Sequence, residues 1–72
     1  MINAVIYTKE SGCAPCQVAK QLIEKKCLKL EIKNADEHLD FLRENNLTEM
    51  PVLLTEDGEY TGRNTIKALM QM

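Results

Sequence analysis

Glycine, proline and aromatic residues are scarce in this sequence. Its 72 residues include three glycines, two prolines, one phenylalanine and no tryptophan. So little glycine and proline argues against a disordered chain, and the 44% hydrophobic and 28% charged residues are typical of a globular protein. A chain of this length buries only roughly 60% of the surface that its unfolded form exposes. We therefore expect one domain, residues 1–72, with one small core.

Long apolar runs and an excess of one charge are missing as well. No apolar run approaches the ~20 residues of a membrane span. The apolar stretch 1–6 is too short for a signal-peptide core and has no basic leader. Nine basic residues are scattered among eleven acidic ones, for a net charge of −2, so we expect neither nucleic acid nor an anionic membrane as a partner. We therefore expect a cytoplasmic protein. We also expect it to be a monomer.

The number of cysteines is odd, so they cannot all be paired in disulfides within the chain. Of the three cysteines, Cys13 and Cys16 are separated only by Ala14 and Pro15. In a reducing compartment, a C-x-x-C pair of this kind indicates redox or metal chemistry rather than a structural crosslink.

Hydrophobic periodicity predicts strands and helices in the order β-α-β-α-β-β-α. The expected strands span residues 2–8, 28–33, 50–55 and about 59–61, and the expected helices run over about 14–26, from Asn34 to about Asn45, and from Asn64 onward. Two strand–helix units favour parallel neighbours, and a hairpin turn at Asp57-Gly58 adds an antiparallel pair. The expected fold class is therefore α/β, a four-stranded mixed sheet with three helices.

The same patterns predict which side chains face the core and which residues cap the helices. The apolar residues expected inside are Val18, Ala19, Leu22 and Ile23 in the first helix, Leu28, Leu30 and Ile32 in the second strand, Ala35, Leu39 and Leu42 in the second helix, and Ile66, Leu69 and Met70 in the last. Asn34 and Glu37 have the spacing of a capping box, and Asn64 is a good N-cap for the last helix.

The cysteine pair falls where the first strand passes into the first helix. Unsatisfied backbone N–H groups at a helix N-terminus favour a thiolate, so Cys13 is expected to be the attacking residue. Cys16, one turn into the helix, is expected to be less exposed and to act as the resolving thiol. Pro15 stiffens the turn or simply starts the helix. Lys9 either adds positive charge to the pair or is a solvated surface lysine.

A metal site is the main alternative for the same two thiols. A structural zinc usually takes four ligands, and the remaining candidates are Cys27 and His38. Cys27 lies about three helical turns and roughly 15 Å beyond Cys16, so it is expected to be a small core residue, and His38 a surface residue. A small metal-carrier domain also has C-x-x-C after its first strand, but it ends in a strand. The helical spacing at residues 64–72 favours redox chemistry.

Pro51, in the stretch TEMPVLL, has two readings. A proline can simply open a strand. It can also be a cis-proline in a tight turn, which would hold the Met50 backbone beside Cys13 so that a substrate pairs with it like an added strand.

Three stretches together, VIYTKESGCAPCQ, EMPVLL and YTGRNTIKAL, resemble the glutaredoxins and the glutaredoxin-like redoxins that reduce ribonucleotide reductase. The resemblance covers essentially the whole chain, in order. It implies a thioredoxin fold and a cis Met50-Pro51 bond. It also implies that Cys13 is the nucleophile, that Cys16 resolves, and that Lys9 is the basic residue before the pair.

The resemblance also implies a substrate-binding set. Gln17 corresponds to a glutathione contact, Met50 to the backbone pairing position, and Gly62, Arg63 and Asn64 to the segment that grips the γ-glutamyl end of glutathione. Asn64 replaces an aspartate there and Arg63 adds a positive charge.

These departures weaken the match to a glutathione site. The hydrophobic Met50 before Pro51, with the acidic Glu49 before it, is more similar to the ribonucleotide-reductase redoxins, which thioredoxin reductase typically reduces. The expected function is therefore reduction of protein disulfides, with ribonucleotide reductase as substrate, no bound cofactor and no metal. Glutathione as reductant and a metal-carrier module stay as alternatives.

Overall fold

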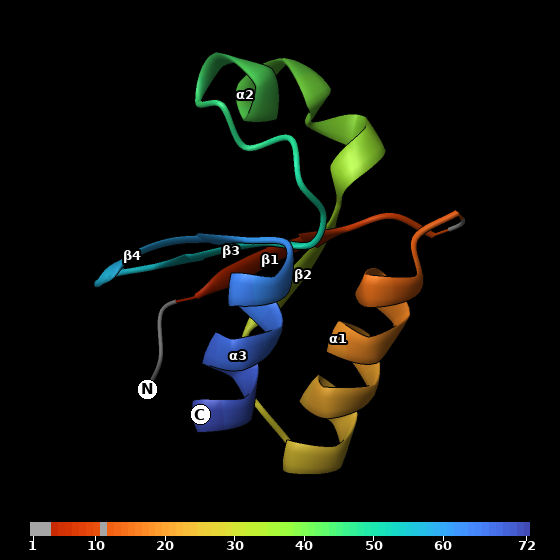
Figure 1. Ribbon diagram of the computed structural model, residues 1–72, viewed down its shortest axis with the longest axis vertical. Helices are drawn as coiled ribbons and strands as arrows, with labels where there is room; N and C mark the ends of the chain where they lie inside the picture. Colours follow the sequence, from red (N-terminus) through yellow and green to blue (C-terminus); the bar gives the residue numbers. More distant parts are fainter. Residues whose placement is uncertain (1–3, 11) are drawn as a thin grey trace.

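The alternating pattern of the sequence folds into one sheet with helices on both of its faces. The computed structural model describes residues 4–10 and 12–72 (Figure 1). In chain order the elements are β1 (Val5–Thr8), α1 (Ala14–Lys26), β2 (Glu31–Asn34), the 3₁₀ turn η1 (Ala35–Glu37), α2 (Leu39–Glu44), β3 (Val52–Thr55), β4 (Gly58–Thr61) and α3 (Arg63–Gln71). The predicted element order is confirmed.

The four strands lie in the order β2-β1-β3-β4. β1 pairs with β2 in parallel, and β3 pairs antiparallel with both β1 and β4. The hairpin between β3 and β4 is closed by Thr55, whose hydroxyl donates to the Gly58 carbonyl at 3.1 Å and accepts from the Asp57 N–H at 3.2 Å. The mixed sheet with three helices is therefore as predicted.

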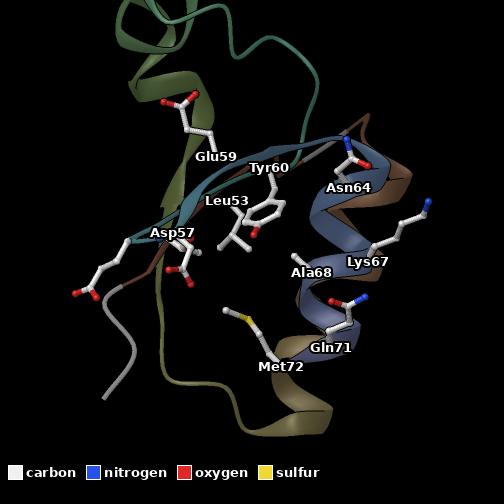
Figure 2. Close-up of a pocket in the computed structure, with 11 residues that line it drawn as sticks. Leu53, Asp57, Glu59, Tyr60, Asn64, Lys67, Ala68, Gln71 and Met72 are labelled. Atoms are coloured by element: carbon white, nitrogen blue, oxygen red, sulfur yellow. Dashed lines mark hydrogen bonds between the residues drawn. The ribbon is translucent and has the colours of Figure 1, made fainter.

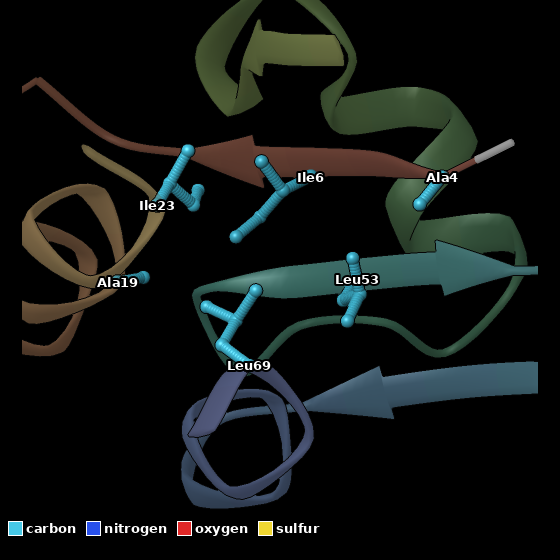
Figure 3. Close-up of a cluster of buried hydrophobic side chains, with 6 residues drawn as sticks. All are labelled: Ala4, Ile6, Ala19, Ile23, Leu53 and Leu69. Carbon is cyan, nitrogen blue, oxygen red and sulfur yellow. The ribbon is translucent and has the colours of Figure 1, made fainter. Parts of the chain in front are cut away.

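Period-two alternation along the central strands sends side chains into two separate cores. α1 and α3 run side by side on one face of the sheet, and α2 lies on the other (Figure 1). The core beneath α1 and α3 is drawn in Figure 3 and consists of Ala4, Ile6, Ala19, Ile23, Leu53 and Leu69. The core on the α2 face consists of Tyr7, Ala35, Leu42, Leu47 and Val52.

The strand–helix boundaries next to the cysteine pair agree with the sequence. α1 begins at Ala14 with Pro15 in its first turn and ends at Lys26, as predicted. β1 ends at Thr8, as predicted, and residues 2–3 of the expected first strand lie outside the described residues. Among residues 4–10 and 12–72, no helix is both long and apolar enough to cross a bilayer.

The second strand was predicted too early in the chain. Leu28 belongs to the turn that closes α1, since its N–H donates to the Ile23 carbonyl at 3.0 Å. Leu28 and Leu30 pack against the core from a loop, and regular pairing starts only at Glu31. Ile32 is 49% exposed, contrary to prediction, because β2 is an edge strand with β1 on one side only.

The second helix was predicted as one piece, but it is broken at His38. The Asn34 side chain accepts the Asp36 N–H at 2.9 Å and starts a 3₁₀ turn, instead of forming the expected capping box with Glu37. The tighter turn shifts the helical phase. Leu39 is consequently 40% exposed, contrary to prediction, while Ala35 and Leu42 are buried as predicted. Asn45 ends α2, as predicted.

Three expectations about α1 and α3 were also wrong. Val18 is 45% exposed and Met70 is 60% exposed, because each lies at the border of its helix's apolar stripe and turns away from the sheet. Asn64 is not an N-cap: α3 starts at Arg63 with Gly62 as its N-cap, which places Asn64 inside the first turn.

Candidate active site

Cys13 and Cys16 form a disulfide at the start of α1, after the loop that follows β1. Cys13 is the N-cap of α1 with extended backbone, φ −137°, and Cys16 follows one turn later, 5.3 Å away between Cα atoms. Cys13 is half-buried and Cys16 is fully buried. The prediction that Cys16 is less exposed than Cys13 is therefore confirmed.

Backbone N–H groups point at both sulfurs. The Cys16 N–H donates to Cys13 Sγ at 3.2 Å, so the sulfur takes the place that an oxygen holds in an ordinary N-cap. The Lys9 N–H donates to Cys16 Sγ at 3.4 Å. N–H groups placed in this way favour negative charge on sulfur when the pair is reduced. Lys9 thus contacts the pair through its backbone, and an effect of its side-chain charge stays a prediction.

The loop before β3 is fastened to the start of α3. The Met50-Pro51 peptide bond is cis, as the resemblance implies. The Gly62 N–H donates to the Glu49 carbonyl at 3.1 Å and to the Pro51 carbonyl at 3.0 Å. The hydroxyl of Thr65, a fully buried residue, donates to the same Pro51 carbonyl at 2.7 Å. Two segments more than ten positions apart in the sequence are therefore held together at Pro51.

The contact of Thr65 with the Pro51 carbonyl is one that the sequence did not predict. The signal for it was a hydroxyl residue three positions after Gly62, in the first turn of the last helix. In a sequence, such a threonine is indistinguishable from one that faces solvent. Its role depends on the carbonyl of a residue 14 positions earlier.

Gly62, predicted to bind glutathione, already uses its backbone in the fold. It is buried and has φ +56° and ψ −127°, a conformation that essentially only glycine adopts without strain. A Cβ at this position would lie 2.9 Å from Glu49 Oε2. The Gly62 N–H serves two carbonyls of the neighbouring loop, so the residue acts as a fastening point.

Arg63 and Asn64 face two different hollows on either side of α3. Arg63 lines a groove of about 440 Å³ between the first turns of α1 and α3. Asn64 lines a hollow of about 760 Å³ between α3 and the β3–β4 hairpin, drawn in Figure 2. The structure therefore does not bring these two predicted ligands of glutathione together.

The remaining predicted site residues are Gln17 and Pro15 in the first turn of α1 and Met50 in the loop before β3. Gln17 is exposed in the first turn of α1, and its N–H donates to the Cys13 carbonyl at 3.4 Å. Pro15 is exposed between the two cysteines. The half-buried Met50 packs against the core on the α2 face, which anchors the residue before Pro51. Pairing of the Met50 backbone with a substrate stays a prediction.

The other two potential metal ligands lie elsewhere. Cys27 was expected in the core, but it is an exposed free thiol at the C-terminal end of α1. Its own backbone is in the left-handed conformation, which turns the chain away from the helix. His38 is half-buried, edge-on to the Tyr7 ring with a centroid distance of 5.3 Å. Within residues 4–10 and 12–72, no group of three or more His, Cys, Asp or Glu is placed to hold a metal ion.

Comparison with known proteins gives a match in structure and none in sequence. No protein-family model matches the chain, and no curated protein sequence does. The fold is similar to the solved structure of the glutaredoxin-like protein NrdH-redoxin from Escherichia coli. The TM-score is 0.80 at 23% sequence identity, over 97% of this chain and 93% of that one. The chain therefore has a thioredoxin fold, as the resemblance implies.

Proposed function

We propose that this protein is a thiol–disulfide oxidoreductase in which Cys13 attacks and Cys16 resolves. The observation that carries the proposal is the unequal environment of the two sulfurs at the start of α1. Each sulfur accepts one backbone N–H, but Cys13 is half-buried, whereas Cys16, one turn further on, is fully buried. An accessible sulfur beside backbone donors suits a nucleophile, and a covered partner suits the second step.

The reaction needs no group beyond the two thiols and an external reductant. In the reduced protein, the Cys13 thiolate attacks one sulfur of a substrate disulfide, and the other substrate sulfur leaves and takes up a proton. Cys16 then gives up its proton and attacks Cys13 Sγ in the mixed disulfide. The second substrate sulfur leaves and takes up a proton. The substrate disulfide has then been reduced by two electrons, and Cys13 and Cys16 have been oxidised to a disulfide. Two thiols of a reductant then reduce the Cys13–Cys16 disulfide and are themselves oxidised to a disulfide.

The proposed substrate is a protein disulfide, with ribonucleotide reductase as the leading candidate because of the resemblance at EMPVLL. We propose thioredoxin reductase rather than glutathione as the reductant. NrdH-redoxin, to which the fold is similar, is described as having a thioredoxin-like activity profile. The Gly62 N–H is already paired, and the neutral Asn64 faces the hairpin hollow. A neutral partner makes a weaker bond to an ammonium than a carboxylate does, since charge-assisted bonds are roughly twice as strong.

Trapping the mixed disulfide tests the assigned roles. The experiment uses a Cys27→Ser background, so that the exposed third thiol does not form adducts. Reduced Cys16→Ser is expected to form a stable covalent complex with an oxidised protein substrate through Cys13, visible on a non-reducing gel and by mass spectrometry. Cys13→Ser is expected to form none. A complex with Cys13→Ser alone would overturn the assignment.

Two coupled assays then separate the reductants. One supplies NADPH and thioredoxin reductase, and the other supplies NADPH, glutathione and glutathione reductase. We expect turnover of a protein disulfide in the first. Turnover only with glutathione would identify a glutathione-dependent glutaredoxin. Stoichiometric Cu(I) or Zn on the reduced protein, with no reductase activity in either assay, would instead favour the metal-carrier alternative.

A further inference from the structure

The loop before β3 lies at the same edge of the sheet as the redox pair. β1 and β3 pair antiparallel, and their register, continued by one position, places Thr8 across from Pro51. Lys9, the residue after Thr8, donates its N–H to Cys16 Sγ at 3.4 Å. Glu49, two positions before Pro51, therefore belongs to a loop that enters the sheet at the edge next to the cysteines.

The start of α3 adjoins the turn that carries the cysteines. Arg63, the first residue of α3, lines one groove with Ala14 and Pro15, the two residues between Cys13 and Cys16. The N-terminal ends of α1 and α3 lie at the same end of the helix pair, next to the sheet (Figure 1). Exposed charges interact over about 10 Å in 0.1 M salt. We therefore expect a charge at the start of α3 to act on a charged substrate at this turn.

Glu49 is held against the start of α3 by its backbone and covers it with its side chain. Its carbonyl accepts the Gly62 N–H at 3.1 Å. A Cβ on Gly62 would lie 2.9 Å from Glu49 Oε2 and 3.5 Å from Glu49 Cβ, so the Glu49 carboxylate fills the space that glycine leaves free. Gly62 is the N-cap of α3. The carboxylate thus lies beside the end of the helix that favours a negative charge.

The charge of Glu49 is exposed to solvent and has no cation beside it. Glu49 is an exposed residue. Within residues 4–10 and 12–72, its carboxylate forms neither a hydrogen bond nor an ion pair. A carboxylate in this position already interacts with the positive end of the α3 dipole, and it repels a second anion that approaches the same place.

We propose that Glu49 determines specificity by disfavouring small anionic disulfides and thiols, glutathione among them, at the redox pair. The inference rests on the proposed function and adds a physical reason for its choice of reductant. Glutathione has a net negative charge, and its carboxylates meet the carboxylate of Glu49 when they approach the start of α3. Neutral and cationic partners are not opposed in this way, so the discrimination comes from a repulsive group rather than from a tighter contact.

Small disulfides of different charge test the inference. 3,3′-Dithiodipropionate has a carboxylate on each side, cystamine has an ammonium on each side, and bis(2-hydroxyethyl) disulfide is uncharged. Reduced protein is mixed with each in about 0.1 M salt, and its oxidation is followed by acid quenching, alkylation and mass spectrometry. A Cys27→Ser background, the parent protein of the test, keeps the exposed third thiol from reacting. Each rate is divided by the rate on the uncharged disulfide, which removes general effects on cysteine reactivity.

Glu49→Gln removes the charge and keeps the size of the side chain and the carbonyl that binds the Gly62 N–H. We expect its dicarboxylate-to-neutral ratio to rise about threefold over that of the parent protein, as one exposed charge pair allows. The cystamine-to-neutral ratio should fall by a similar factor. Both changes should shrink at about 0.5 M salt, where exposed charges are screened.

Two further variants make the test specific to the charge at this position. Glu49→Asp keeps the carboxylate and should stay close to the parent ratios. Glu31→Gln changes the net charge equally at an exposed site, where Glu31 pairs with Val5 at the opposite end of β1 from the redox pair. It should leave both ratios unchanged.

The other outcomes each decide a separate question. Unchanged ratios in Glu49→Gln, with a normal rate on the neutral disulfide, would overturn the inference and leave the proposed function intact. An equal shift in Glu31→Gln would assign the effect to net charge and also overturn it. Glutathione disulfide should react faster with Glu49→Gln than with the parent protein, and a slower reaction would show that Glu49 instead attracts its ammonium groups. No reaction of the parent protein with any disulfide would contradict the proposed function itself.

Discussion

The two ends of α1 each carry cysteine, in opposite circumstances. At the first end, Cys13 is a half-buried N-cap with extended backbone, and its sulfur accepts an N–H and bonds to Cys16. At the last end, Cys27 is exposed, unpaired with another cysteine, and held at φ +53°. A backbone N–H donates to the Cys13 sulfur at the helix start, whereas Cys27 lies at the helix end, where the backbone offers carbonyl acceptors instead of free N–H donors. Position in the helix therefore gives one residue type two different roles.

Hydrogen bonds close the C-terminal end of α1 and link it to α3. The Cys27 N–H donates to the Glu24 carbonyl at 3.2 Å, and the Leu28 N–H donates to the Ile23 carbonyl at 3.0 Å. This is the Schellman arrangement, in which a left-handed residue, usually glycine, closes the helix. The Lys26 ammonium donates to the carbonyls of Leu69 and Met70, which ties the end of α1 to the end of α3. The end of α1 that carries the Cys13–Cys16 disulfide thus belongs to a helix that is held at its other end.

Replacing Cys13 and Cys27 one at a time is expected to give the largest difference in activity between the two ends of α1. Cys13→Ser is expected to lower disulfide reductase activity by about 10³-fold or more, because the attacking nucleophile is lost. Cys27→Ser should keep activity close to that of the wild type. Both are measured in the thioredoxin-reductase-coupled assay. A comparable loss in Cys27→Ser would show that the two ends are not separated in function.

Alkylation of the reduced protein compares the two thiols directly. At pH 7 we expect iodoacetamide to modify Cys13 about tenfold faster than Cys27, although Cys27 is the more exposed, because the thiolate is the reacting species and N–H donors favour it at Cys13. Quenched time points and mass spectrometry of the two peptides give both rates in one sample. Faster labelling of Cys27 would mean that exposure outweighs the helix terminus.

Replacing Cys27 by glycine tests what its left-handed backbone costs in stability. Cys27→Gly should raise the free energy of unfolding by roughly 0.5–1 kcal/mol, because glycine adopts the left-handed conformation without the Cβ clash. Cys27→Ala is the matched control, since alanine also removes the thiol but keeps the Cβ. Urea unfolding of the reduced proteins measures both. No gain of glycine over alanine would contradict the argument.

The smallest expected effect is at Lys26. Lys26→Met keeps most of the aliphatic stem but removes the ammonium that donates to the α3 carbonyls, and should lower stability by about 0.5 kcal/mol. Hydrogen exchange should quicken in the last turn of α3 while that at the start of α1 stays the same. Lys25→Met, at the neighbouring exposed lysine, is the control. Faster exchange across the whole chain would point to global destabilisation instead.

Local sequence signals predicted most of the fold and the position of the cysteine pair. Pro15 and the amphipathic pattern after it marked both ends of α1, since a helix-starting proline and a 3.6-residue period act within one segment. The same signals failed for Val18, Ile32 and Leu39, which the structure leaves exposed. Periodicity marks an apolar side chain but says nothing about whether another element covers it.

Local sequence signals set the order of elements and the place of Cys13 and Cys16 at a helix start. These depend on interactions between residues a few positions apart. Only the tertiary structure decided that Gly62 and Thr65 fasten the Pro51 loop. It also sent the adjacent Arg63 and Asn64 into different hollows, because successive residues of a helix point about 100° apart and α3 lies between two partners.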